Sequence, residues 1–220
     1  MPLRLDLAAA IVDLDGTLVH TLGDFTAALA AVHDELGLRT IAPAQVEAMV
    51  GKGSEHLIRS ALHAAGAGED RYAAAWSAYQ RHYARINGQF AEVYEGVEDG
   101  LRLLRSRGLR LACVTNKPTD FARELLARKQ LASFFHVVYG GDAFERKKPH
   151  PQPLLRACEA LGSGPGRTLV VGDSSNDAAA ARAAGCPVVL VTYGYNHGEP
   201  VRAVDAEGYV DSLAQLGAWI

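Results

Sequence analysis

The sequence predicts an α/β fold: a doubly wound parallel-sheet (Rossmann-like) core with a helical cap inserted after the first strand. After residue 96, short and continuously apolar stretches such as LVVG and PVVLV alternate with helical patterns. Strands buried on both faces of a parallel sheet have this composition. The opening stretch AAAIVDLD has it too, whereas residues 21–88 read almost entirely as helices. We therefore expect a catalytic core at residues 1–19 and 94–220 and a cap at residues 20–93.

The cap segment carries helical signals along its length. Its first expected helix presents one apolar face through residues spaced four and three apart: Phe25, Leu29, Val32 and Leu36. Pro43 fits the first turn of a second helix, and Ser54 is a candidate N-cap for a third. We expect hinges near residues 19–21 and 93–96.

A fourth cap helix is expected in the segment DRYAAAWSAYQRHYARI, which places four aromatic residues on one stripe: Tyr72, Trp76, Tyr79 and Tyr83. We interpret this stripe as core packing without a functional role. In the core, strands are expected at 109–115, 136–140, 167–173 and 187–194, and helices at 119–131, 151–161 and 175–185.

Composition and charge narrow the range of possible functions. The chain has 220 residues, 49% of them hydrophobic, and a formal net charge of −3 without a Lys/Arg-rich block, which argues against a nucleic-acid partner. No apolar run approaches the roughly 20 residues of a membrane span. Cys113, Cys158 and Cys186 lack metal-type spacing, so we expect reduced thiols. These features predict a cytoplasmic protein without a membrane partner. We expect a monomer or a homodimer, a choice that the sequence leaves open.

Polar residues follow the predicted strands, at the edge of the sheet where open α/β folds bind ligands. These residues are Asp13, Asp15, Thr115, Asn116, Lys147, Lys148, Asp173 and Asp177. Each one alone has an ordinary explanation: Asp177 as a helix cap, for example, or Lys147 and Lys148 as a solvated surface pair. Together they form a chemically coherent set.

This set fits phosphoryl transfer. Crowded carboxylates are tolerated when a hard divalent cation shares them, and Mg²⁺ binds through one or two carboxylates plus phosphate oxygens. One carboxylate can act as a nucleophile, and its neighbour two residues on can act as general acid and base. Gly16 allows a turn whose backbone amides face a phosphate, and a lysine can hold the carboxylate and the phosphate together.

The motifs DLDGT, VTN, the Lys148 of KKPHP, and GDSSND resemble, in order, those of the haloacid dehalogenase superfamily of phosphohydrolases. More narrowly, VTNKP, KKPHPQPLL, GDSSNDAAAARAAGCP and TYGYNHGEP resemble the bacterial phosphoglycolate phosphatases. The resemblance covers essentially the whole chain. One departure is His20, because members of this subgroup often carry an acidic residue shortly after DGTL. The hinge of this protein and its substrate contacts therefore need not match those of the subgroup.

The resemblance implies a role for each matching residue. Asp13 would be the nucleophile and a metal ligand, and Asp15 the general acid/base that gives its backbone carbonyl to the metal. Thr115 would hydrogen-bond the phosphoryl group, with Gly16 and Asn116 also on the substrate side. Lys148, rather than Lys147, would neutralise the phosphate because it directly precedes Pro149. Asp173 would complete the metal shell, with Asp177 behind it.

The leading prediction is a Mg²⁺-dependent phosphatase that acts on a small phosphorylated metabolite, 2-phosphoglycolate first, through an aspartyl-phosphate. Lys52, in a glycine-flanked loop, is our candidate for binding a substrate carboxylate, although an ordinary exposed lysine fits as well. The segment GKGS around it is not a P-loop, because Val46 replaces the first glycine.

Two other functions remain open. A phosphomutase of the same superfamily would use the same paired aspartates on a sugar phosphate. A non-enzymatic phospho-accepting signalling domain also uses clustered acids, but it lacks a helical cap. A halide-displacing dehalogenase has no use for Asp15 and the metal.

Overall fold

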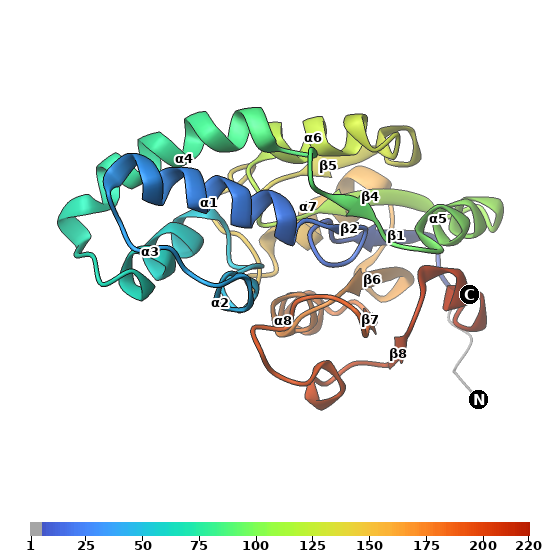
Figure 1. Cartoon of the computed structure of the whole chain (residues 1–220). Coiled ribbons are helices and arrows are strands. Elements are labelled where there is room, and N and C mark those ends of the chain that lie inside the picture. The colour runs from blue at the N-terminus through green and yellow to red at the C-terminus, as the bar shows by residue number, and fades with distance from the viewer. Residues whose placement is uncertain (1–5) are drawn as a thin grey trace.

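The computed structural model describes residues 6–220 and has a six-stranded parallel sheet at its centre (Figure 1). The strand order is β5-β4-β1-β6-β7-β8. The strands span Ala9–Val12 (β1), Arg110–Val114 (β4), Val137–Tyr139 (β5), Thr168–Gly172 (β6), Val188–Val191 (β7) and Gly208–Val210 (β8). β1 pairs in parallel with both β4 and β6, so the chain order reverses at β1. In such sheets ligands bind at this switch point, beyond the carboxyl ends of the strands.

Helices cover both faces of the sheet, as expected from its apolar strands. These helices are α5 (Val97–Ser106), α6 (Thr119–Arg128), α7 (Gln152–Leu161) and α8 (Ser175–Ala184). Successive residues of a strand point to opposite faces. Accordingly, Ala10 and Val12 pack in the cluster that includes residues of α5 and α6, and Ala9 and Ile11 pack with α7 and α8. The predicted doubly wound core is confirmed.

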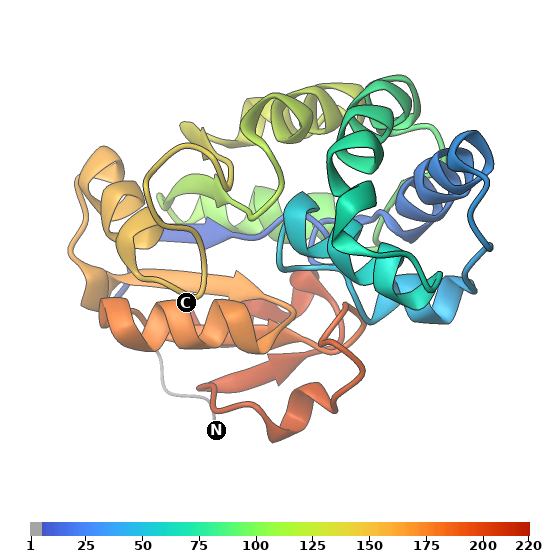
Figure 2. The ribbon, with the colours of Figure 1, turned by 90° about the vertical axis from the view of Figure 1, so that its left-hand side faces the viewer.

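A second group of helices lies beside one end of the sheet (Figure 2). It comprises α1 (Leu22–Leu36), α2 (Pro43–Glu47), α3 (Ser54–Ala64) and α4 (Tyr72–Ile86). These helices share a separate hydrophobic cluster that includes Phe25, Leu29, Ile58 and Tyr79. Since all four follow β1 and its turn, they form the cap that the sequence predicts.

A two-stranded antiparallel ribbon, β2 (Val19–His20) and β3 (Glu92–Val93), joins the cap to the core. The predicted boundaries at residues 20 and 93 fall within this ribbon and remain a prediction. Asp24, at the start of α1, is fully buried and accepts hydrogen bonds from the amides of Gly88 (2.6 Å) and Phe90 (2.7 Å). The chain therefore leaves and re-enters the core at one fixed place.

Local details differ from expectation in two places. Ser54 is the first residue of α3 rather than its cap: Gly53 holds the N-cap position, at a φ of 90°, where a side chain would be strained. In addition, neither β8 nor the two hinge strands was predicted. Pro43 does occupy the first turn of α2.

Short 3-10 helices complete the described chain, at Glu69–Arg71, Ala132–Phe134, Pro165–Arg167, Val201–Ala203 and Leu213–Ala218. Within residues 6–220, none of the helices combines the length and apolar character needed to cross a bilayer.

Candidate active site

Three buried carboxylates meet beyond the carboxyl ends of β1 and β6. Asp13 directly follows β1, Asp173 directly follows β6, and Asp177 lies in the first turn of α8. One carboxylate oxygen from each residue lies within 4.8 Å of the others. The two strands are parallel neighbours, so the residues that follow them are brought together by the pairing itself.

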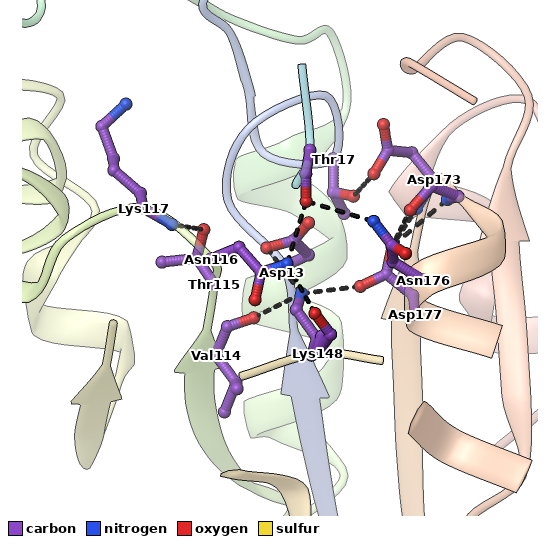
Figure 3. A network of polar contacts seen from close by, with 12 residues as sticks. Asp13, Thr17, Val114, Thr115, Asn116, Lys117, Lys148, Asp173, Asn176 and Asp177 are labelled. Carbon is purple, nitrogen blue, oxygen red and sulfur yellow. Dashed lines mark hydrogen bonds and ion pairs between the residues drawn. The ribbon is translucent and has the colours of Figure 1, made fainter. Parts of the chain in front are cut away.

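Lys148 contacts two of these carboxylates (Figure 3). Its Nζ lies 2.7 Å from Oδ1 of Asp177 and 2.9 Å from Oδ1 of Asp13, and it also donates to the carbonyl of Val114 at 2.8 Å. One ammonium group thus faces three carboxylates. When all four groups are ionised, the cluster holds two uncompensated negative charges in a buried place.

The pKa values reflect this imbalance. Burial raises the pKa of Asp13 to about 7; Lys148 opposes the rise, and the charge of Asp177 adds to it. Burial likewise raises the pKa of Asp173 well above its ordinary value, and Asp177 and Asp13 raise it further. For Lys148, burial lowers the pKa, but Asp13 and Asp177 outweigh it, so the pKa lies above its ordinary value. The cluster therefore favours an added positive charge.

The residues present fit a hard divalent cation. The cluster offers oxygen donors, which Mg²⁺ prefers. Beyond its ion pair with Lys148, Oδ1 of Asp13 accepts no hydrogen bond from the described residues, although it is buried. The oxygen therefore has only the lysine as a partner, and together with the excess negative charge of the cluster this supports metal binding by Asp13, Asp173 and Asp177.

Two tight turns hold Asp173 in place. Gly16 has a φ of 85°, and a Cβ on it would lie 2.1 Å from Oδ2 of Asp173. The amide of Tyr195 donates to the same oxygen at 2.6 Å, and Thr17 Oγ1 donates to Oδ1 at 3.3 Å. Only glycine fits at position 16, because a side chain there would displace the carboxylate.

Asp177 takes part in the helix cap considered for it and also binds Lys148. Its Oδ2 accepts hydrogen bonds from Ser174, from the amide at 3.2 Å and from Oγ at 2.8 Å, which completes a capping box at the start of α8. Its Oδ1 accepts from Lys148. The helix cap thus fixes the carboxylate that holds the lysine.

Thr115 and Asn116 follow β4, the other neighbour of β1. The amide of Thr115 donates to the carbonyl of Tyr139 at 3.0 Å. Asn116 Nδ2 donates to the carbonyls of Lys148 (2.9 Å) and of Gly51 in the cap (3.0 Å). Asn176 also donates to Gly51, at 3.2 Å, so one cap carbonyl binds two core side chains.

Asp15 faces a partner that the sequence analysis did not identify. Its Oδ1 accepts from Nζ of Lys117 at 3.0 Å, and both side chains are buried. Lys117 follows Asn116 in the VTNKP motif, so the signal was a lysine next to predicted site residues. In Figure 3 the Lys117 side chain extends away from Lys148. The two lysines therefore serve the two aspartates of DLDGT separately.

A pocket of about 410 Å³, part of it open to solvent, lies between cap and core. The core contributes Asp13, Asp15, Thr115, Asn116 and Lys117, and the cap contributes Phe25, Met49, Val50, Gly51, Gly53, Ser54, Leu57, Tyr79 and Tyr83. Tyr79 and Tyr83 are fully buried, as the aromatic stripe predicts. They also line this pocket, which an interpretation as core packing alone did not anticipate.

Two other predicted positions lie outside this pocket. Lys52 lines a neighbouring surface cleft with Lys147, Lys148 and Asn176, whereas its neighbours Gly51 and Gly53 line the pocket itself. His20 lies in the hinge ribbon, where its Nδ1 is 2.6 Å from the hydroxyl of Tyr195. The departure at position 20 therefore belongs to the hinge and not to the pocket wall.

Comparison with known proteins agrees with this geometry. Residues 10–191 match the family described as haloacid dehalogenase-like hydrolase. The chain belongs to this family. It is 38% identical to a phosphoglycolate phosphatase of Thiobacillus denitrificans, over 98% of this chain and 96% of the relative. It is 41% identical to one of Nitrosospira multiformis, over 97% and 95%.

Two solved structures show the same fold. A predicted phosphoglycolate phosphatase of Haemophilus somnus superposes with a TM-score of 0.93 at 30% identity, covering 97% of each chain. A putative β-phosphoglucomutase of Thermotoga maritima shares the fold at a TM-score of 0.75 and 24% identity, covering 96% of each chain. Together with the full-length relatives, the family identifies this chain as a phosphoric monoester hydrolase.

Proposed function

We propose that this phosphatase hydrolyses 2-phosphoglycolate to glycolate and phosphate, with Mg²⁺ as cofactor and an aspartyl-phosphate on Asp13 as intermediate. The observation that carries the proposal is the placement of Asp13: one side faces Lys148 and the carboxylate cluster, and the other faces the pocket that also holds Asp15. Relatives named phosphoglycolate phosphatase match nearly the whole chain and support the choice of substrate.

In the first step, a carboxylate oxygen of Asp13 attacks phosphorus and the bond from phosphorus to the glycolate oxygen breaks. Asp15 donates a proton to that oxygen, so glycolate leaves as an alcohol. Lys148 reduces the charge repulsion between the nucleophile and the phosphoryl oxygens, because its Nζ lies 2.9 Å from Oδ1 of Asp13. Thr115, buried beside Asp13 in the pocket wall, is placed to hydrogen-bond the phosphoryl group.

In the second step, Asp15, now a carboxylate, removes a proton from a water molecule that attacks the same phosphorus. The bond between phosphorus and Asp13 breaks, and phosphate leaves. Asp13, Asp173, Asp177 and the backbone carbonyl of Asp15 would hold Mg²⁺, which supplies charge neutralisation for the phosphoryl oxygens when bound. The buried pocket limits the access of other water molecules.

The proposal is tested by two measurements on the purified protein with Mg²⁺. The first is kcat/KM against a panel of phosphate monoesters, where 2-phosphoglycolate is expected to rank first. The second is rapid acid quench with radiolabelled substrate, which is expected to trap a protein-bound phosphate that hydroxylamine releases. A panel led by another ester would overturn the substrate, and the absence of a labelled protein would overturn the covalent step.

A phosphomutase is the second candidate, favoured only by the shared fold and the paired aspartates. A mutase must retain a sugar phosphate, whose hydroxyl groups need several hydrogen-bond partners. The cap side of the pocket presents the apolar side chains of Phe25, Met49, Val50 and Leu57, together with the hydroxyls of Ser54, Tyr79 and Tyr83. This mostly apolar wall favours a small ester with few polar groups. Release of inorganic phosphate without any isomerised sugar phosphate would exclude the mutase. A cytoplasmic location and a monomeric or homodimeric state remain predictions.

A further inference from the structure

The pocket contains a buried cation that the phosphoryl group does not use. Lys117 is the one basic residue among the described residues that line it. Its side chain is only 2% exposed, and its Nζ is 4.6 Å from the ring centre of Phe25 and 4.8 Å from that of Tyr83. A buried ammonium needs close anionic or hydrogen-bonding partners to offset its desolvation.

The partners of Lys117 leave room for one more acceptor. Nζ donates to the carboxylate of Asp15, at 3.0 Å to Oδ1 and at 3.4 Å to Oδ2, and to the hydroxyl of Tyr83 at 2.5 Å. An ammonium group has three N–H donors, and the one that makes the long second contact with Asp15 can turn to a further acceptor. Tyr83 accepts from Lys117 in this contact, which leaves its own hydroxyl proton available to donate.

Tyr79 supplies a second, independent sign of a ligand. It is fully buried in the wall of the same pocket, and its hydroxyl makes no well-aligned hydrogen bond among residues 6–220, although the Ser54 side chain is near enough to lower its pKa. An unpartnered buried hydroxyl costs roughly 1–3 kcal/mol, which a bound acceptor would remove. Tyr79 stacks on Tyr83 at 5.1 Å between ring centres, so the two hydroxyls belong to one wall of α4. Burial raises the pKa of both tyrosines, and both therefore keep the proton that they would donate.

From these contacts we infer that Lys117, with the hydroxyls of Tyr83 and Tyr79, binds the carboxylate of the substrate and so determines specificity. The inference rests on the proposed function. Asp15 must reach the ester oxygen of 2-phosphoglycolate, and only one CH₂ separates that oxygen from the carboxylate. A cation that binds the carboxylate must therefore lie next to Asp15, and Lys117 does. Lys52, which lines the neighbouring cleft, has no such relation to Asp15 in the described contacts.

The contact between Lys117 and Asp15 also offers a competing explanation, in which Lys117 only positions the general acid. Three esters separate the two roles: 2-phosphoglycolate, ethyl phosphate, which lacks the carboxylate, and p-nitrophenyl phosphate, whose leaving group needs little protonation. For Lys117→Met we expect kcat/KM to fall roughly 10- to 100-fold more on 2-phosphoglycolate than on ethyl phosphate, the range of a charge-assisted hydrogen bond. Equal losses on both alkyl esters, with p-nitrophenyl phosphate spared, would overturn the inference in favour of positioning.

A binding measurement provides a readout apart from turnover. The non-hydrolysable pair is 3-phosphonopropionate and propylphosphonate, which differ by a carboxylate in place of a methyl group. By calorimetry with Mg²⁺, the wild-type protein is expected to prefer 3-phosphonopropionate at least about tenfold, and Lys117→Met to lose most of this preference. Retention of the full preference by Lys117→Met, with its loss in Lys52→Met, would assign the carboxylate to Lys52 and overturn the inference.

Tyr79→Phe keeps the test valid if Lys117→Met does not fold. It removes one hydroxyl that makes no well-aligned hydrogen bond within residues 6–220, and we expect a roughly 3- to 10-fold smaller preference for 3-phosphonopropionate with an unchanged affinity for propylphosphonate. An unchanged preference in Tyr79→Phe would overturn the role of this hydroxyl. A wild-type protein that binds both phosphonates equally would contradict the proposed substrate itself, which is a different failure from a preference that survives in the variants.

Discussion

Nζ of Lys148 donates to Oδ1 of Asp177 at 2.7 Å, although Asp177 is also the residue that caps the start of α8. Asp177 therefore does more than stabilise the start of this helix. Because Asp177 also accepts hydrogen bonds from Ser174, its carboxylate has a fixed direction, and the lysine that it binds is held 2.9 Å from Asp13. Lys148 thus reaches Asp13, the proposed nucleophile, already desolvated and oriented, as electrostatic catalysis requires.

Replacing Lys148 by Met should lower kcat/KM by about 100- to 1000-fold, the range found when one preorganised donor is lost from a site that stabilises developing charge. The lysine also opposes the rise in the pKa of Asp13, so its loss should favour the protonated, non-nucleophilic form. Steady-state kinetics with Mg²⁺ would measure the effect. Lys147→Met is the matched control and should stay near wild type; similar losses in both variants would contradict a specific role for Lys148.

Asp13→Asn and Asp15→Asn should fail in different ways. Asp13→Asn removes the nucleophile and should abolish the trapped phosphoprotein. In Asp15→Asn, kcat/KM on an alkyl ester should fall by roughly two to four powers of ten, because the leaving oxygen is no longer protonated. With p-nitrophenyl phosphate, phosphorylation of Asp15→Asn should be far less impaired, and burst kinetics would show it. Near-normal turnover in Asp13→Asn would refute the covalent mechanism.

Mg²⁺ should stabilise the protein more at pH 8 than at pH 5. Burial raises the folded-state pKa of Asp13 from 3.8 to about 7, and that of Asp173 also rises. The folded state therefore holds protons that the unfolded chain has released, and the metal-free protein loses stability as the pH rises from about 4 to about 7. A cation binds the deprotonated carboxylates and offsets this loss.

Thermal melts at both pH values, with chelator or with Mg²⁺, would measure this effect. In Asp173→Asn, which lacks one of the three carboxylates, the pH dependence of the Mg²⁺-induced rise in Tm should shrink. An equal Mg²⁺-induced rise at pH 5 and pH 8 in the wild-type protein would contradict metal binding by these raised-pKa groups. Turnover should stop with the chelator as well.

The sequence predicts the carboxylate cluster well because the parallel strands determine where these carboxylates lie. Asp13 and Asp173 each end an apolar strand, and adjacent parallel strands bring such residues together whatever the side chains around them. Asp177 lies in the helix that follows β6, a neighbour of β1, and Lys148 lies in the loop that follows β5, two strands from β1. The topology alone therefore explains most of the predicted site.

The pocket wall was not predictable in the same way. The contact between Lys117 and Tyr83 joins a core loop to a cap helix 34 residues earlier, and no periodic pattern encodes how the cap docks. The stripe that contains Tyr79 and Tyr83 has the sequence pattern of core packing, because most of the surface of these two side chains is packed against other residues. Likewise, β8 has three residues and begins with Gly208, so it lacks the apolar run that identified the other strands.

Replacing Asp24 by Ala should destabilise the protein by about 2–4 kcal/mol and loosen the cap. Asp24 is fully buried, and its two oxygens accept from the amides of Gly88 and Phe90. Alanine would leave both amides, which are partly buried, without their charged acceptor, and each such hydrogen bond contributes roughly 1.5–3 kcal/mol. Urea unfolding would measure the change. Asp34→Ala, an exposed position on the same helix, should change stability by less than about 0.5 kcal/mol.

The effect of Asp24→Ala on catalysis distinguishes the contribution of the hinge from that of the catalytic residues. Asp24 does not line the pocket among the described residues, so the carboxylate cluster should keep its Mg²⁺ affinity. A cap that closes less often should raise KM for 2-phosphoglycolate, the proposed substrate, because Tyr79 and Tyr83, which we infer to bind its carboxylate, lie on α4. Turnover of p-nitrophenyl phosphate, which does not need the carboxylate contact, should change less. A wild-type stability together with a wild-type KM in Asp24→Ala would show that these two hydrogen bonds do not fix the cap.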